Sequence, residues 1–164
     1  MNVEKRYSVR SYRNDSVEDE KLVRVLEAAR LAPTAHNSQA FKVVVIRTAG
    51  REEELKKIYS RDFFVQAPIV LGIFANPEES WVRSDGTNYG FVDAAIVADH
   101  IILAATALGL GTCWIGAFNS QAARDVVGLG KSFEPVAFTP LGYPGSSDVN
   151  AKRRKSLDEL VVYL

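Results

Sequence analysis

Residues 91–108 form the sequence feature that most constrains the fold. This stretch, FVDAAIVADHIILAATAL, is apolar at nearly every position. A helix on a protein surface has one apolar face and one polar face, so a helix that is apolar on nearly all sides must be covered on nearly all sides. We therefore predict a long helix that packs against a sheet on one side and against a second subunit on the other.

The rest of the composition indicates one domain, residues 1–164, with a substantial core: 47% of the residues are hydrophobic. The 20 basic and 20 acidic residues cancel, so overall charge favours neither a nucleic-acid partner nor a membrane surface. The opening residues MNVE lack the pattern of a secretory signal, and we expect a cytoplasmic protein. With one cysteine, Cys113, and two histidines, His36 and His100, the chain is not expected to form an internal disulfide or a metal site.

Hydrophobic periodicity and turn residues predict alternating helices and strands in a layered α+β or α/β domain. A stripe containing Leu22 and Leu26 predicts a helix that is capped by Ser16 and ends near Pro33. The other elements expected are strands at 41–46, 69–75, 112–115 and 136–139, helices at 51–59 and 120–127, and a short helix at 156–160. Residues 76–88 read as a polar loop.

Arg6, Ser8 and Arg10 alternate in the stretch RYSVRSY, residues 6–12. If the stretch is extended, these three side chains point the same way. A second basic run, KRRK, spans residues 152–155. Alone, the first run is equally typical of a solvated terminus, and the second is most often just a solvated tail. Together, on an otherwise neutral chain, they could converge on one dianion, and the arginine fork matches phosphate oxygens.

Two loop segments could present backbone groups to a flat ligand. The first is APTAHNSQAF, residues 32–41, in which small and amide side chains lead into a predicted strand. The second is GLGTCWIGAF, residues 109–118, in which the third glycine of a dinucleotide-binding fingerprint would fall on Trp114. We therefore reject that fingerprint and expect Gly111 and Gly116 to let a strand edge approach something planar.

These segments, in this order, resemble the nitroreductase family of flavin enzymes. The motifs that carry the resemblance are RYSVRSY, APTAHNSQAFKVVVI, DAAIVADHIILAATALGLGTCWIGAF and PLGYPGSSDVNAKRRKSLDELV. The resemblance implies an α+β fold around a central mixed sheet flanked by helices, and a homodimer with flavin mononucleotide (FMN) at the subunit interface. It also implies reduction of the flavin by NADH or NADPH, followed by reduction of a small organic acceptor.

The resemblance also implies roles for single residues. Arg6, Tyr7 and Ser8 occupy the family's first flavin-binding stretch, and Arg6 would bind the phosphate with Lys152 and Arg154. Arg10 matches the basic residue beside the flavin's pyrimidine edge, where a cation offsets the negative charge of the reduced ring.

The flavin ring itself would be bound from two further segments. Pro33, Thr34, Ala35, Asn37 and Gln39 match a segment that reaches the flavin from the partner subunit, and Trp114, Ile115 and Gly116 match a strand edge whose backbone N–H faces the flavin N5 atom. No side-chain acid or base is required, because the cofactor does the chemistry. Asp93 is expected to be structural.

The chain departs from the family pattern at three places. Ala40 and Phe41 stand where Pro-Trp is usual, Tyr7 stands where Arg or His is common, and residues 59–66 contain no match for the family's ring-side amide or lysine. The segments 51–66 and 76–90 are short, which favours an open site. Two other hypotheses remain: a flavin-binding protein that stores or senses FMN without turnover, and a dimeric module that binds another anion.

Overall fold

A computed structural model describes residues 1–145 and 152–164, and its centre is a four-stranded sheet. The strands are β1 (Phe41–Arg47), β2 (Ile69–Ala75), β3 (Gly111–Thr112) and β4 (Glu134–Gly142), in the order β1-β2-β4-β3. The α+β class is confirmed. The expected mixed sheet is not what these strands form: they pair antiparallel, and the parallel pairing described is a single bridge between Ser8 and Thr112.

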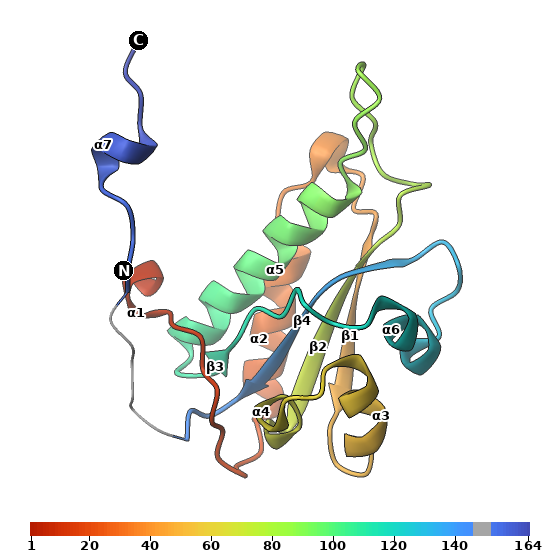
Figure 1. Cartoon of the computed structure of the whole chain (residues 1–164), viewed down its shortest axis with the longest axis vertical. Helices are drawn as coiled ribbons and strands as arrows, with labels where there is room; N and C mark the ends of the chain where they lie inside the picture. The colour runs from red at the N-terminus through yellow and green to blue at the C-terminus, as the bar shows by residue number, and fades with distance from the viewer. Residues whose placement is uncertain (146–151) are drawn as a thin grey trace.

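Helices cover both faces of the sheet. One apolar core lies between the sheet and the pair α2 (Asp19–Arg30) and α5 (Gly90–Ala107), and a second lies beside α3 (Glu52–Ile58), α4 (Asp62–Gln66) and α6 (Ser120–Val127). Strand β2 is buried along its whole length. Its side chains alternate, with Leu71 in the first core and Phe74 in the second, as the period of two in a strand requires. Figure 1 shows this arrangement of the layers.

Helix α5 is the predicted long apolar helix, one residue earlier than expected. Val97 and Ile101 are fully buried against the sheet and α2, whereas Phe91 and Val92 are 49% and 45% exposed. By length and composition alone α5 could cross a membrane. Its packing between α2 and the sheet is that of a core helix, so we interpret it as one. Its exposed apolar side is the surface that we predicted to face a second subunit.

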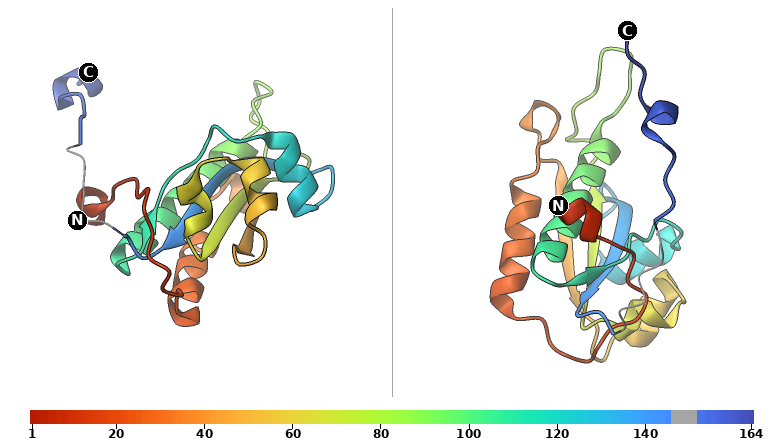
Figure 2. Two further views of the ribbon diagram at one scale, coloured as in Figure 1. Left: turned by 60° about the horizontal axis from the view of Figure 1, so that its bottom comes forward. Right: turned by 90° about the vertical axis from the view of Figure 1, so that its left-hand side faces the viewer.

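The N-terminal helix lies beside the beginning of the C-terminal segment. Helix α1 (Asn2–Lys5) leads into residues 6–12, which are extended and bridge to the sheet at Ser8 and Tyr12. Residues 152–164, which include α7 (Leu157–Leu160), pass α1 and run away from the body of the molecule (Figure 1, Figure 2). Every residue of that segment is exposed.

Several element boundaries differ from the predictions. Ser16 is not the cap of α2: Val17 is buried, and the helix begins two residues later with Glu18 at its N-cap. The strand predicted at 112–115 ends at Thr112, and β4 is longer than predicted at both ends. Three short elements were not predicted: α1, α4 and the single turn η1 (Ala35–Asn37). The strand at 69–75 and the helix at 120–127 are confirmed to the residue.

Candidate functional site

The stretch 6–12 is fastened to the strand that follows α5. The backbone N–H of Val9 donates to the carbonyl of Thr112 at 2.9 Å. A Cβ atom at Gly111 would lie 2.7 Å from Val9 Cγ2, which is closer than real side chains approach. The expectation for Gly111 is thereby corrected: its missing side chain makes room for Val9, not for a planar ligand. At Gly116 a Cβ atom would meet only the Trp114 Nε1 atom, at 3.7 Å.

Ser8 bridges to Thr112 at the sheet edge, and Arg6 and Arg10 stand two residues before and after it in the extended segment. All three act on the thiol of Cys113: burial raises its pKa, while the charge of Arg10, a hydrogen bond with Ser8 and the charge of Arg6 each lower it. Arg6 and Ser8 are half-buried, as is the neighbouring Tyr7, and Arg10 is exposed. The N-terminal segment therefore holds both arginines within electrostatic range of this thiol.

One of the two C-terminal cations predicted to join this group reaches the N-terminal helix. The Lys152 Nζ donates to the carbonyl of Val3 at 3.0 Å and to the carbonyl of Glu4, which places its charge beside α1 and close in sequence to Arg6. Arg154 instead donates to the carbonyl of its neighbour Arg153 at 2.7 Å. The structure thus places Lys152 at the N-terminal segment and leaves Arg154 bonded within its own segment.

The segment 33–39 is an exposed, strained loop. Among the described residues, the non-glycine residues with left-handed backbone are His36, Asn37 and Gln39, with φ of 53°, 55° and 51°. Such conformations cost on the order of 1–3 kcal/mol each and persist only where other contacts hold them. Thr34 supplies two of these contacts, because its carbonyl accepts from Asn37 N–H at 2.9 Å and its Oγ1 accepts from Gln39 N–H at 3.1 Å.

Two further contacts attach this loop to its surroundings. From inside, the buried carboxylate of Asp93 accepts from Ala35 N–H at 3.0 Å and from the Ser38 hydroxyl at 3.4 Å. From outside, the His36 ring stacks on Trp81, with centroids 5.3 Å apart. Trp81 lies in the loop between β2 and α5 that we expected to be merely polar, and its sequence position gave no signal of this contact.

The third predicted segment, 114–116, continues from β3 along the sheet. Trp114 is 43% exposed, Gly116 is exposed, and Ile115 is buried. The N–H of Ile115 donates to the carbonyl of Phe138 at 2.8 Å. Of the three residues, Trp114 and Gly116 therefore remain candidates to offer an N–H to a ligand.

The N-terminal segment and the strained loop lie at opposite ends of α5 (Figure 1). Asp93, which binds the loop, is in the first turn of α5, whereas Thr106, near the other end, lines a small cavity with Arg6 and Tyr7. Because an α-helix rises about 1.5 Å per residue, Asp93 and Thr106 lie roughly 20 Å apart. Within one chain, the two groups of predicted ligand residues do not form one site.

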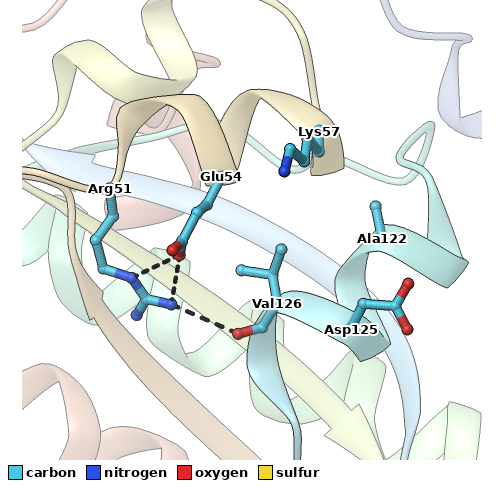
Figure 3. A pocket seen from close by; sticks show the side chains of 6 residues that line it. All are labelled: Arg51, Glu54, Lys57, Ala122, Asp125 and Val126. Atoms are coloured by element: carbon cyan, nitrogen blue, oxygen red, sulfur yellow. Dashed lines mark hydrogen bonds and ion pairs between the residues drawn. The ribbon is translucent and has the colours of Figure 1, made fainter.

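The cavities agree with that conclusion. The one beside Arg6 has a volume of about 30 Å³, whereas ligand pockets usually measure roughly 300–1,000 Å³. A larger cavity of about 380 Å³ lies between α3 and α6, and it is lined by none of the predicted residues (Figure 3). There Arg51 is already bonded to Glu54 at 3.0 Å and turned toward the carbonyl of Val126.

Comparisons with known proteins point to one protein family. A family model described as the nitroreductase family matches residues 3–61 and 50–143. A crystal structure of a nitroreductase family protein from Clostridium difficile 630 is 34% identical, with a TM-score of 0.90, over 99% of this chain and 95% of that one. An FMN reductase (NAD(P)H) of Bacillus subtilis is 29% identical, over 94% of this chain and 68% of its own length. An NADH dehydrogenase of Thermus thermophilus is 26% identical, over 91% and 88%.

Proposed function

Because this chain belongs to the nitroreductase family, we propose that it is an NAD(P)H-dependent oxidoreductase that binds FMN and reduces a small organic acceptor. Relatives named as an FMN reductase and an NADH dehydrogenase support the use of flavin and of a nicotinamide reductant. When bound, FMN would supply the redox chemistry, taking a hydride from NAD(P)H and passing it to the acceptor.

The residues of the N-terminal segment fit the phosphate of FMN. Arg6 and Arg10 lie around Cys113, and Lys152 is bonded to the carbonyl of Val3 just before them. Guanidinium groups bind phosphate oxygens through paired, charge-assisted hydrogen bonds. We propose that Arg6 and Lys152 bind the phosphate, with Tyr7 and Ser8 alongside, and that Arg154 joins them when the ligand is present.

One observation supports a site shared between two subunits. The two segments proposed to bind the ligand, the N-terminal segment and the loop 33–39, lie at opposite ends of α5 within one chain. A two-fold dimer with α5 helices side by side and antiparallel would bring the loop of one subunit, residues 33–39, to the N-terminal segment of the other. The exposed apolar side of α5 and the exposed residues Leu160, Val162 and Tyr163 supply surface for such an interface. We propose a homodimer whose two sites are each completed by both subunits.

Within such a site the chain's own residues bind and orient the ligand. Arg10 is exposed, which leaves its charge available to the electron-rich edge of a reduced ring. Trp114 and Gly116 offer backbone and ring surface along the strand edge, while Pro33, Thr34, Ala35, Asn37 and Gln39 approach from the partner subunit. No catalytic side chain is required, because none of these groups has to transfer a proton to start the reaction.

The function is tested with purified protein under anaerobic conditions. We expect FMN to copurify and NADH or NADPH to bleach its absorption, with quinones or nitroaromatics restoring the colour. Steady-state kinetics should give parallel double-reciprocal lines, since reductant and acceptor would use one face of the ligand in turn. Bound FMN that NAD(P)H does not bleach would favour storage or sensing, and protein without affinity for FMN would refute the proposal.

A further inference from the structure

We propose that Asp93 is a positioning residue: its buried carboxylate holds the loop 34–39 in the left-handed conformation that a ligand at this loop requires. The inference rests on the proposed function for the identity of that ligand, FMN. The geometry of the loop is independent of that function, because the contacts of Asp93 that define it lie within a single chain.

The first support is the burial of the carboxylate together with its choice of partners. Asp93 is 2% exposed, in the first turn of α5. A buried carboxylate has to be hydrogen-bonded, and the described donors to this one, Ala35 N–H and the Ser38 hydroxyl, both belong to the loop. The position near the helix N-terminus adds favourable interaction with a negative charge. The Asp93 carboxylate of α5 thus accepts hydrogen bonds from the loop at two points, Ala35 and Ser38.

The second support is the placement of those two points. Ala35 and Ser38 flank His36 and Asn37, two of the three left-handed residues, and the third, Gln39, follows at once. A strained conformation needs contacts that fix both of its ends. The Thr34 contacts lie within the loop itself, whereas the bonds to Asp93 tie it to a core helix.

The third support is that the fold has little need of this loop shape. Pro33, His36, Asn37 and Gln39 are exposed, and the strand that follows begins only at Phe41. The strain is therefore better explained by what the loop binds than by what it joins.

The test compares Asp93→Ala and Asp93→Leu, which remove the acceptor, with Asp93→Asn, which keeps one. Leucine fills the space of the carboxylate and so gives a second variant if alanine destabilises the fold. Thr48→Val is the matched control, since it removes another buried side-chain hydrogen bond, to Ala67, at the opposite end of β1. The readouts are amide exchange of Ala35 by NMR without FMN, and the FMN dissociation constant by fluorescence titration.

We expect Asp93→Ala and Asp93→Leu to speed the exchange of the Ala35 amide at least tenfold and to weaken FMN binding at least tenfold. Asp93→Asn should keep both within about threefold, and Thr48→Val should change neither, even where it lowers the melting temperature. An Ala35 amide that stays protected in the alanine and leucine variants would overturn the inference. So would faster exchange with unchanged FMN affinity. If the wild type binds no FMN, the proposed function fails, while the exchange data still decide whether Asp93 holds the loop.

Discussion

Ser8 pairs with Thr112 in a parallel bridge, so the segment that carries Arg6 and Arg10 is aligned with the strand that leaves α5. This pairing sets which side chains of the segment face the sheet and which face outward. Val9 points into the core at 3% exposure, whereas Ser8 is half-buried and Arg10 is exposed. The phosphate site that we propose depends on this register.

Gly111→Ala should disturb that register. A Cβ atom at this position would lie 2.7 Å from Val9 Cγ2 and 3.0 Å from Val9 Cβ. Because valine has few alternative rotamers, we expect a loss of about 1–3 kcal/mol in the free energy of unfolding, measured by urea denaturation, with weaker FMN binding. Gly116→Ala, where the new atom meets an ordinary contact at 3.7 Å, is the control and should keep its stability. Equal stability of both variants would mean that Val9 moves aside freely.

Arg10→Ala should slow reduction of bound FMN by NADH while leaving FMN binding largely intact. The loss of a cation at a developing negative charge costs about 2.7–4 kcal/mol in enclosed sites. Arg10 is exposed, so we expect a smaller effect, roughly tenfold to a hundredfold. Anaerobic stopped-flow absorption measures this step. Arg13→Ala is the matched control, since Arg13 is bonded to Asp15 on the same segment. Equal rates in the two variants would remove Arg10 from the redox edge.

Lys152→Glu should weaken FMN binding. A charge-assisted contact with phosphate is worth roughly 1.5–3 kcal/mol, so the dissociation constant should rise about tenfold to a hundredfold. Arg154→Glu should do the same if Arg154 turns to the phosphate when the ligand is present. Lys131→Glu, on the loop after α6, gives the same change of charge away from the site. Titration of the apoprotein with FMN measures all three, and affinity unchanged in both Lys152→Glu and Arg154→Glu would refute the convergence of the two basic segments.

The thiol of Cys113 should make stability depend on pH in the alkaline range. Burial raises its pKa in the folded protein, so the unfolded thiol ionises at lower pH than the folded one. Its contribution to stability is therefore complete below the ordinary pKa of a thiol and is lost as pH rises through the higher folded value. Melting temperatures of wild type and Cys113→Ala across this range should converge at high pH. Parallel curves would show that the thiol pKa is not raised.

Local patterns predicted most of the fold. Strand 69–75 is a continuous apolar run, helix 120–127 is amphipathic, and both have clear ends and were placed to the residue. The helix cap predicted at Ser16 is wrong, because Val17 is buried and the helix begins only after it, whatever capping residues precede it. The single-turn elements α1 and α4 are too short to carry a hydrophobic period.

The candidate site was predictable as a set of residues and not as an arrangement. Alternation predicts Arg6, Ser8 and Arg10 on one side of an extended segment, and in the structure all three influence the thiol of Cys113. Val9 packs into the space that the missing side chain of Gly111 leaves, and His36 stacks on Trp81. Both contacts join segments that are far apart in the sequence. No local pattern reports such contacts, because they arise from tertiary packing.

We propose that each FMN site takes its phosphate-binding segment from one subunit and its loop from the other. Arg6→Glu damages the first, and Asn37→Pro damages the second, because proline cannot adopt the left-handed φ of Asn37. A heterodimer contains one subunit with Arg6→Glu and one subunit with Asn37→Pro. If each site is shared between the subunits, one site contains both defects and the other site contains neither.

The decisive measurement is therefore the FMN content of heterodimers carrying two different affinity tags, beside both parent homodimers at the same FMN concentration. We predict that the parent homodimers are empty and that each heterodimer binds one FMN. Heterodimers as empty as their parents would contradict it, because sites built within a single subunit would each retain one defect.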